Sequence, residues 1–218
     1  MHLRKKVNKN RKSQFIIIGS LFLILSDICI ISLKYYQNYL DNNIEKQKID
    51  EFMLKQKVVD LPASNTQEEI EISEEIQYKE EQKSDNYIAV LEIPEINLKR
   101  GIYPKNSSEN NVNKNIELLK ESDMPDEENG NFILAGHNGT SKVSYFKNLT
   151  KLKKDDLAYI YYSGNKYVYK LVNSYDIEKT GEADIIRNGQ KTTLTLITCR
   201  HNTDKQIIFI FELIKDGE

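Results

Sequence analysis

The chain has 218 residues, a net charge of −2 and two cysteines, and 39% of its residues are apolar. Composition changes so sharply along the chain that a single globule is excluded. The one basic run lies beside an apolar segment and not in a globular region, which argues against a nucleic-acid-binding surface.

The N-terminal residues predict a membrane anchor. Residues 1–14 form a basic tail, and its first twelve residues, "MHLRKKVNKNRK", contain no acid. Residues 15–33 are almost entirely apolar and are just long enough to span a hydrocarbon core of about 30 Å. A cleaved signal peptide would have a shorter apolar region and a small-residue cleavage site, which this sequence lacks. The positive-inside rule therefore predicts a single-pass protein of the cell membrane with a cytoplasmic N-terminus.

Residues 34–86 predict an extracytoplasmic stalk followed by an acidic linker. Residues 34–60 carry apolar residues at loose helical spacing, and Pro62 ends that pattern. The stretch "SNTQEEIEISEEIQYKEEQKSDN" is rich in glutamate and poor in large apolar residues, which is typical of a solvated linker. The remaining residues, 87–218, have the mixed composition of one globular domain.

The globular part shows repeated strand signals separated by turns. In chain order they are "YIAVLEIPEI", "GIYP", "GNFILAGHNG", "LAYIYYSGNKYVYKLVNSYDI", "TTLTLITC" and "QIIFIFELI". The fourth stretch holds two alternating runs around a Ser-Gly-Asn turn, a hairpin signal. "VSYFKNLTKLKKDD" begins with a short helical turn. The pattern predicts a mainly β fold, a barrel or sandwich of seven or eight strands with short helices.

Few residues of this domain carry nucleophilic or acid–base chemistry. Cys29 lies in the expected membrane span, so it cannot pair with Cys199, which ends a strand as a free thiol. A nucleophilic thiol needs an imidazole within reach or another device that stabilises the thiolate. His137, between glycines in "FILAGHNG", is the better candidate, and His201 is the alternative. A metal site made by Cys199 and His201 lacks a second pair of ligands at zinc spacing.

These residues resemble the sortases, the membrane-anchored cysteine transpeptidases of Gram-positive bacteria. "YIAVLEIPEINLKRGIY" is similar to the first strands of that family, "GNFILAGHNG" to the segment that presents its catalytic histidine, and "TLITC" to its T-L-x-T-C signature. The resemblance covers roughly residues 87–213. It implies a closed sortase-type β-barrel with His137 and Cys199 at one mouth, of a class A- or D-like kind or a small class B-like kind.

The resemblance also implies the reaction of a thiol protease that acts as an acyltransferase. Cys199 would cleave an LPxTG-like sorting signal through a thioacyl intermediate, and His137 would act as acid and then as base. The second substrate would be a peptidoglycan precursor of the cell wall or another amine. The alternative is a catalytically weak or inactive domain that binds sorting signals or surface proteins.

The third catalytic residue of the family is an arginine near the start of the last strand, and this sequence has none there. Lys205 is the expected replacement by position, with Arg200 and Gln206 as alternatives. The resemblance implies that this residue stabilises the developing oxyanion. Thr198, next to the nucleophile, is expected to contact the substrate.

No cofactor or metal is expected. The acidic residues that would have to bind calcium, if calcium tunes a loop, show no fixed ligand spacing. They are Glu109, Asp126, Glu127 and Glu128.

The basic tail and the apolar run together predict on which side of the membrane the globular domain lies. Protease added to intact protoplasts is expected to remove residues 87–218, because everything after Leu33 lies outside. Immunoblotting with an antibody against the domain measures the loss, and a cytoplasmic protein serves as the protected control. A domain that resists protease until the membrane is lysed would contradict the predicted orientation.

Overall fold

The structure, a computed structural model, describes residues 3–59, 86–200 and 203–215. Nearly all of the expected acidic linker and His201 lie outside these residues. The chain divides into two compact units, residues 1–47 and residues 48–218, and each is described by itself. The domain boundaries expected from the sequence are close to this division but are not tested by it.

The first unit is the N-terminal part of the helix α1, Leu3–Val59. This helix is long and apolar enough to cross a membrane, with a mean hydropathy of 2.5 in its most apolar window. The hydroxyls of Ser20, Ser26 and Ser32 each donate to a backbone carbonyl three or four residues earlier. These bonds satisfy the hydroxyls within the helix, as a hydrocarbon environment requires.

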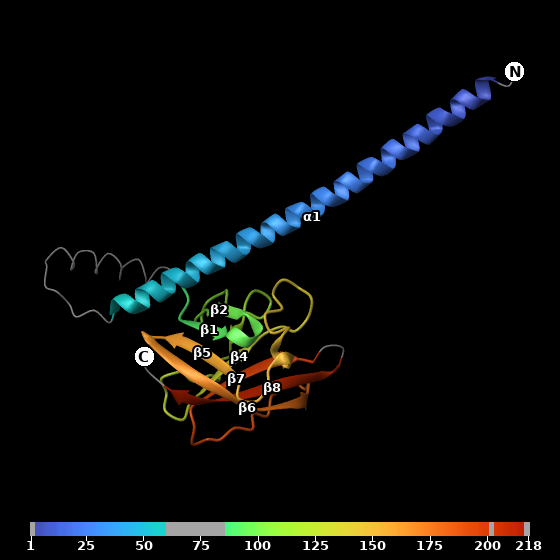
Figure 1. The fold of residues 1–218 in the computed structure, drawn as a ribbon. Coiled ribbons are helices and arrows are strands. Elements are labelled where there is room, and N and C mark those ends of the chain that lie inside the picture. Colours follow the sequence, from blue (N-terminus) through green and yellow to red (C-terminus); the bar gives the residue numbers. More distant parts are fainter. Residues whose placement is uncertain (1–2, 60–85, 201–202, 216–218) are drawn as a thin grey trace, which may run out of the picture. The chain divides into compact units, whose positions relative to one another are not determined.

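Within its described residues, the second unit contains the end of α1, eight strands and two short 3₁₀ helices (Figure 1). The strands are β1 (Ala89–Ile93), β2 (Leu98–Ile102), β3 (Glu117–Leu118), β4 (Asn131–Ala135), β5 (Leu157–Tyr162), β6 (Asn165–Glu178), β7 (Thr193–Cys199) and β8 (Lys205–Lys215). The 3₁₀ helices are η1 (Pro94–Ile96) and η2 (Leu149–Lys151). The expected strands are present, and the helical turn expected around Tyr145–Leu149 is displaced to Leu149–Lys151.

The strands form one sheet in the order β2-β1-β5-β6-β8-β7-β4-β3, which curls into a nearly closed barrel. The buried side chain of Asn115, in the connection before β3, is bonded to the edge strand β2. Its amide donates to the carbonyl of Gly101 in β2 at 2.7 Å and accepts a hydrogen bond from Arg100 Nε at 2.7 Å. The mainly β barrel predicted from the sequence is confirmed.

The predicted hairpin joins β5 and β6 through Ser163 and Gly164. Both residues have positive φ, 50° and 81°, as a two-residue turn between antiparallel strands requires. The turn fixes the register of β5 against β6, and β6 pairs on its other side with β8.

Alternating residues of the strands pack on opposite faces of the sheet. The interior face forms the main core, to which β4, β7 and β8 contribute Phe132, Leu134, Leu194, Leu196, Ile207, Phe209 and Phe211. The opposite face of the same three strands forms a second apolar cluster, made by Ile133, Ile197, Ile208 and Ile210. Because these strands bury both faces, β4 and β8 read in the sequence as nearly continuous apolar runs, whereas β7 carries buried threonines on one face.

A buried polar contact fixes the register between β4 and β7, the parallel pair of the barrel. The Asn131 side-chain oxygen accepts hydrogen bonds from the hydroxyls of Thr193 at 3.0 Å and Thr195 at 2.8 Å. All three residues are almost fully buried. The threonines that alternate with apolar residues before Cys199 therefore bind one asparagine on the neighbouring strand.

Loss of the Asn131 side chain is expected to destabilise the barrel. Asn131→Ala leaves the buried Thr195 hydroxyl without its acceptor and the Thr193 hydroxyl with only a long contact of 3.4 Å to the Gly130 carbonyl, which costs roughly 1–3 kcal/mol. Urea unfolding of the full chain in detergent, followed by tyrosine fluorescence, measures the change, because the chain has 13 tyrosines and no tryptophan. Asn188→Ala removes an exposed asparagine and serves as the control. Equal unfolding midpoints for the two variants would contradict a stabilising effect of the buried Asn131 contact.

Candidate active site

His137 and Cys199 lie at the carboxyl ends of neighbouring parallel strands. The β4–β7 register pairs Ala135 with Ile197, and the Gly136 N–H continues the ladder by donating to the Ile197 carbonyl at 3.1 Å. Two residues past the Ala135–Ile197 pair, the chain reaches His137 on one strand and Cys199 on the other. Alternation places both side chains on the same face as Ile197, the face opposite the barrel interior.

Polar contacts hold the two strand ends together. The Asn138 amide donates to the carbonyl of Cys199 at 2.9 Å, and the Thr198 hydroxyl donates to the carbonyl of Gly136 at 2.8 Å. A side chain at position 136 would collide with the Phe146 ring, since a Cβ there would lie 2.7 Å from a ring carbon. The glycine before the histidine is therefore required by close packing.

Asn113 contacts the imidazole of His137. The distance between His137 Nε2 and Asn113 Oδ1 is 3.2 Å. An amide oxygen can only accept a hydrogen bond, so this contact assigns the proton to Nε2.

Cys199 is a free, partly exposed thiol. The neighbouring Thr198 is buried, and its hydroxyl is already bonded to the Gly136 carbonyl. The structure thus gives Thr198 a role in joining β7 to β4, and the expected contact with substrate stays a prediction.

The three candidates for the missing arginine lie on different faces. The β7–β8 register pairs Cys199 directly with Gln206, so their side chains share a face. Lys205 and Arg200 follow the opposite alternation. The Lys205 ammonium is 3.5 Å from a carboxylate oxygen of Glu178, and Arg200 binds Asp176 at 2.7 Å.

Gln206 therefore differs from the two cations in its available hydrogen bonds. In the part of the chain that the structure describes, its side-chain amide has no hydrogen-bond partner. Both cations lie close to carboxylates of β6.

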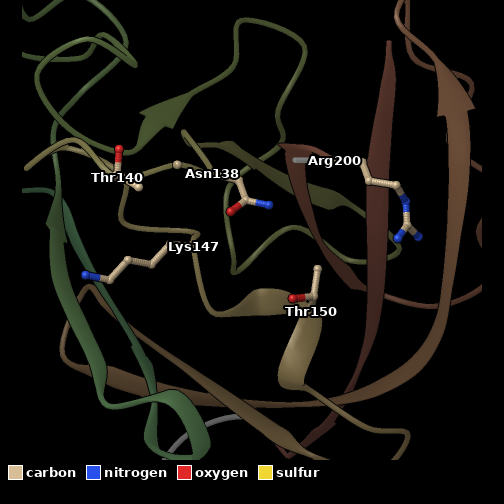
Figure 2. A pocket seen from close by; sticks show the side chains of 6 residues that line it. Asn138, Thr140, Lys147, Thr150 and Arg200 are labelled. Atoms are coloured by element: carbon tan, nitrogen blue, oxygen red, sulfur yellow. The ribbon is translucent and has the colours of Figure 1, made fainter. Parts of the chain in front are cut away.

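A polar pocket of about 420 Å³ opens beside the end of β7, and Figure 2 shows Lys147 and Arg200 on opposite sides of it. The residues that line it are Asn138, Gly139, Thr140, Lys147, Thr150 and Arg200. Asn138 connects the pocket to the nucleophile through its hydrogen bond with the Cys199 carbonyl.

A buried apolar cluster lies on the same face of the sheet as the nucleophile. It is made by Ile133, Ile197, Ile208 and Ile210, and residues of β6 and of the β6–β7 connection pack against it and cover it. Tyr175 ties this connection to β6, because its hydroxyl donates to the Asp184 carbonyl at 3.0 Å and accepts from the Ile186 N–H at 2.6 Å. Burial raises the pKa of Tyr175.

No group of three or more His, Cys, Asp or Glu residues that could hold a metal ion occurs within residues 3–59, 86–200 and 203–215. Glu109, one of the acidic residues considered for calcium, is paired with Lys114 at 2.7 Å. The expectation of a cofactor-free site stays a prediction.

The sequence pattern missed two polar side chains that surround the site. Asn138 could have been noticed because it directly follows the histidine in "GHNG". Asn113 carries no such signal, since it lies 24 residues before His137 and before the strands β3 and β4, and only the fold brings it to His137.

Comparison with known proteins gives a consistent result. The sequence model of the sortase domain matches residues 91–213, more than half of the chain. The chain is similar to sortase A of Staphylococcus aureus, at 26% identity over 90% of this chain and 92% of that protein. It also resembles sortase A of Bacillus anthracis, at 30% identity over 51% of each chain.

Solved structures show the same fold. A sortase D5 transpeptidase of Clostridium perfringens superposes with a TM-score of 0.57, at 26% identity, over 79% of this chain and 99% of that one. Sortase A of Listeria monocytogenes superposes with a TM-score of 0.51 over 61% of this chain and 90% of that one. At 24% identity, this second likeness concerns the fold alone.

Proposed function

Because this chain belongs to the sortase family, we propose that its barrel is a cysteine transpeptidase that acts on LPxTG-like sorting signals. One observation carries the proposal. Cys199 ends β7, and His137 lies two residues past the end of the neighbouring parallel strand β4, so that the pairing of these strands brings a thiol and an imidazole to one edge of the sheet, where they can serve one reacting carbonyl.

In the first step, the Cys199 sulfur attacks the carbonyl carbon of the threonine in the sorting signal. A carbon–sulfur bond forms and gives a tetrahedral intermediate. The bond to the glycine nitrogen then breaks, and His137 in its imidazolium form gives a proton to the leaving amine. The product of this step is a thioester between the surface protein and Cys199.

In the second step, an acceptor amine attacks the thioester carbonyl. A carbon–nitrogen bond forms, the carbon–sulfur bond breaks, and the sulfur leaves as a thiolate. His137, now neutral, takes the proton that the amine loses, so that the site returns to its starting state. The acceptor in the proposed reaction is an amine of the cell wall or of a wall precursor.

Gln206 is the best-placed side chain for the oxyanion. Its amide N–H is a neutral donor on the face of Cys199, whereas the Lys205 stem begins on the other face and its ammonium lies near Glu178. A neutral donor aimed at the developing charge stabilises the intermediate, although less strongly than a charged one.

Anchorage places this reaction at the outer side of the cell membrane. The proposed arrangement has α1 as the single membrane span, the basic tail in the cytoplasm and the barrel outside. A stalk and linker would allow the barrel to reach surface proteins that are still held in the membrane.

Removal of the thiol is expected to abolish both cleavage and transpeptidation. Cys199→Ala deletes the nucleophile with a very small change in volume, and His137→Ala deletes the acid and base. Mass spectrometry of the full chain, incubated with an LPxTG-like peptide, measures the acyl-enzyme at Cys199.

An electrophilic LPxTG-like peptide distinguishes the enzyme from a domain that only binds sorting signals. It should label Cys199 in the wild type. Binding without labelling would support the idle binding domain, and turnover by Cys199→Ala would reject the proposed mechanism.

Substitutions at the three oxyanion candidates are expected to differ in their effect on kcat. Gln206→Ala should lower kcat by roughly 10²-fold, at the low end for loss of an oxyanion donor. Lys205→Ala and Arg200→Ala should have smaller effects, because these cations are partly exposed and screened. Rates of cleavage of an LPxTG-like peptide measure the three variants. If Lys205→Ala is the most damaging change, the lysine holds the role that position in the sequence suggests.

A further inference from the structure

One carboxyl group lies inside the apolar run of α1. Among residues 15–33, Asp27 is the only Asp, Glu, Lys or Arg residue. It lies six residues before Leu33, about 9 Å along the helix axis from the end of the run. An aspartate side chain is too short to carry its carboxyl group over that distance to the lipid headgroups. A carboxyl group at this depth in hydrocarbon is costly and needs a polar partner.

The helix itself offers Asp27 no such partner. The side chains three and four positions away are all apolar, namely Leu23, Ile24, Ile30 and Ile31. Lys34, the nearest cation on the same line of the helix, is seven residues away, about 10 Å along the axis. Asp27 is exposed, and its carboxyl group has no hydrogen-bond or ion-pair partner within the part of the chain that the structure describes. Its partner must therefore come from outside the chain.

We propose that Asp27 is the central contact of a transmembrane interface between two copies of this chain. The inference goes beyond transpeptidation and rests on the proposed membrane anchorage alone. The basic tail inserts every copy in the same direction, so the carboxyl groups of two copies lie at the same depth. In a two-fold pair of parallel helices, a residue near the axis faces its own equivalent. A helix of another protein would need a polar group at this same depth, which a second copy has by identity.

The line of the helix on which Asp27 lies suits close packing against a parallel helix. Ser20 is seven residues before Asp27, nearly two full turns, so the two side chains lie on one line. The Ser20 side chain is small, and its hydroxyl is already bonded to the Ile17 carbonyl at 2.8 Å. Small residues let two membrane helices approach closely. The apolar residues Leu23 and Ile30, between and beyond the polar positions, complete a seven-residue pattern.

Two facing carboxyl groups satisfy each other within the hydrocarbon. They can share a proton and hydrogen-bond directly, whereas each alone would remain without a partner. A single polar residue at such a position also fixes the register and the number of helices, as it does in coiled coils. The interface is therefore expected to hold two copies in one parallel register.

Energy transfer between two labelled forms of the full chain tests this interface. One form carries a donor and the other an acceptor fluorescent protein on the N-terminal tail, and both are reconstituted into phosphatidylcholine vesicles. Transfer is measured over a range of protein-to-lipid ratios and compared with the transfer that random proximity gives. The fit yields an association constant in the membrane, and no other protein is present that could supply a partner helix.

Asp27→Leu is expected to lower this association constant roughly 3- to 20-fold, the range for one polar contact between membrane helices. Asp27→Asn should keep most of the association, because an amide can also hydrogen-bond across the interface. Ser32→Leu is the matched control. It also replaces a polar side chain of the run by leucine, but it lies about 140° around the helix from Asp27 and should leave the association constant unchanged.

Four results would overturn the inference: transfer in the wild type no higher than random proximity gives, an unchanged constant in Asp27→Leu, an equal loss in Ser32→Leu, or an Asp27→Asn variant as weak as Asp27→Leu. Flotation of the vesicles shows separately whether the chain is inserted. A chain that does not float with the lipid would overturn the proposed anchorage, and the inference with it. Cleavage of an LPxTG-like peptide by the same vesicles reports on the proposed transpeptidase independently of both.

Discussion

The parallel pairing of β4 with β7 is the constraint on which the candidate site depends. A slip of one residue in this pairing would turn every side chain of one strand to the other face, so that a histidine and a thiol at the strand ends would point to opposite sides. Asn131 prevents such a slip, because its oxygen binds both Thr193 and Thr195 in one register. Buried hydrogen bonds thus fix the register at the amino end of this strand pair, and the same register positions the candidate catalytic residues at its carboxyl end.

The two faces of these strands have different tasks. The interior face is filled by large apolar side chains and supplies the stability of the barrel. The opposite face begins with the buried Asn131 contact, continues as a buried apolar cluster and ends at the partly exposed Cys199. Alternation of side chains allows one short strand to hold the core and to present a thiol, and a neighbouring strand of the same pattern presents the imidazole.

Polar side chains from loops complete the surroundings of the thiol and the imidazole. Asn113 contacts the ring of His137, and Asn138 contacts the backbone at Cys199. The cations closest to the thiol in sequence are held instead toward β6, Arg200 by Asp176 and Lys205 near Glu178. Arg200 and Lys205 are thus close to the site in sequence, but their side chains do not share the face of Cys199, because neighbouring residues of a strand point to opposite faces.

The sequence by itself determined the apolar helix, the mainly β barrel, the hairpin turn at Ser163 and Gly164, and the pair of candidate catalytic residues, because periodicity, turn residues and short motifs are local properties. It did not decide which residue near the start of β8 faces the thiol, since Lys205 and Gln206 both precede apolar residues at alternate positions. The cross-strand pairing of Cys199 with Gln206 decided it. The contact of Asn113 with His137 and the pocket beside Cys199 also needed the fold, because they join side chains that are distant along the chain.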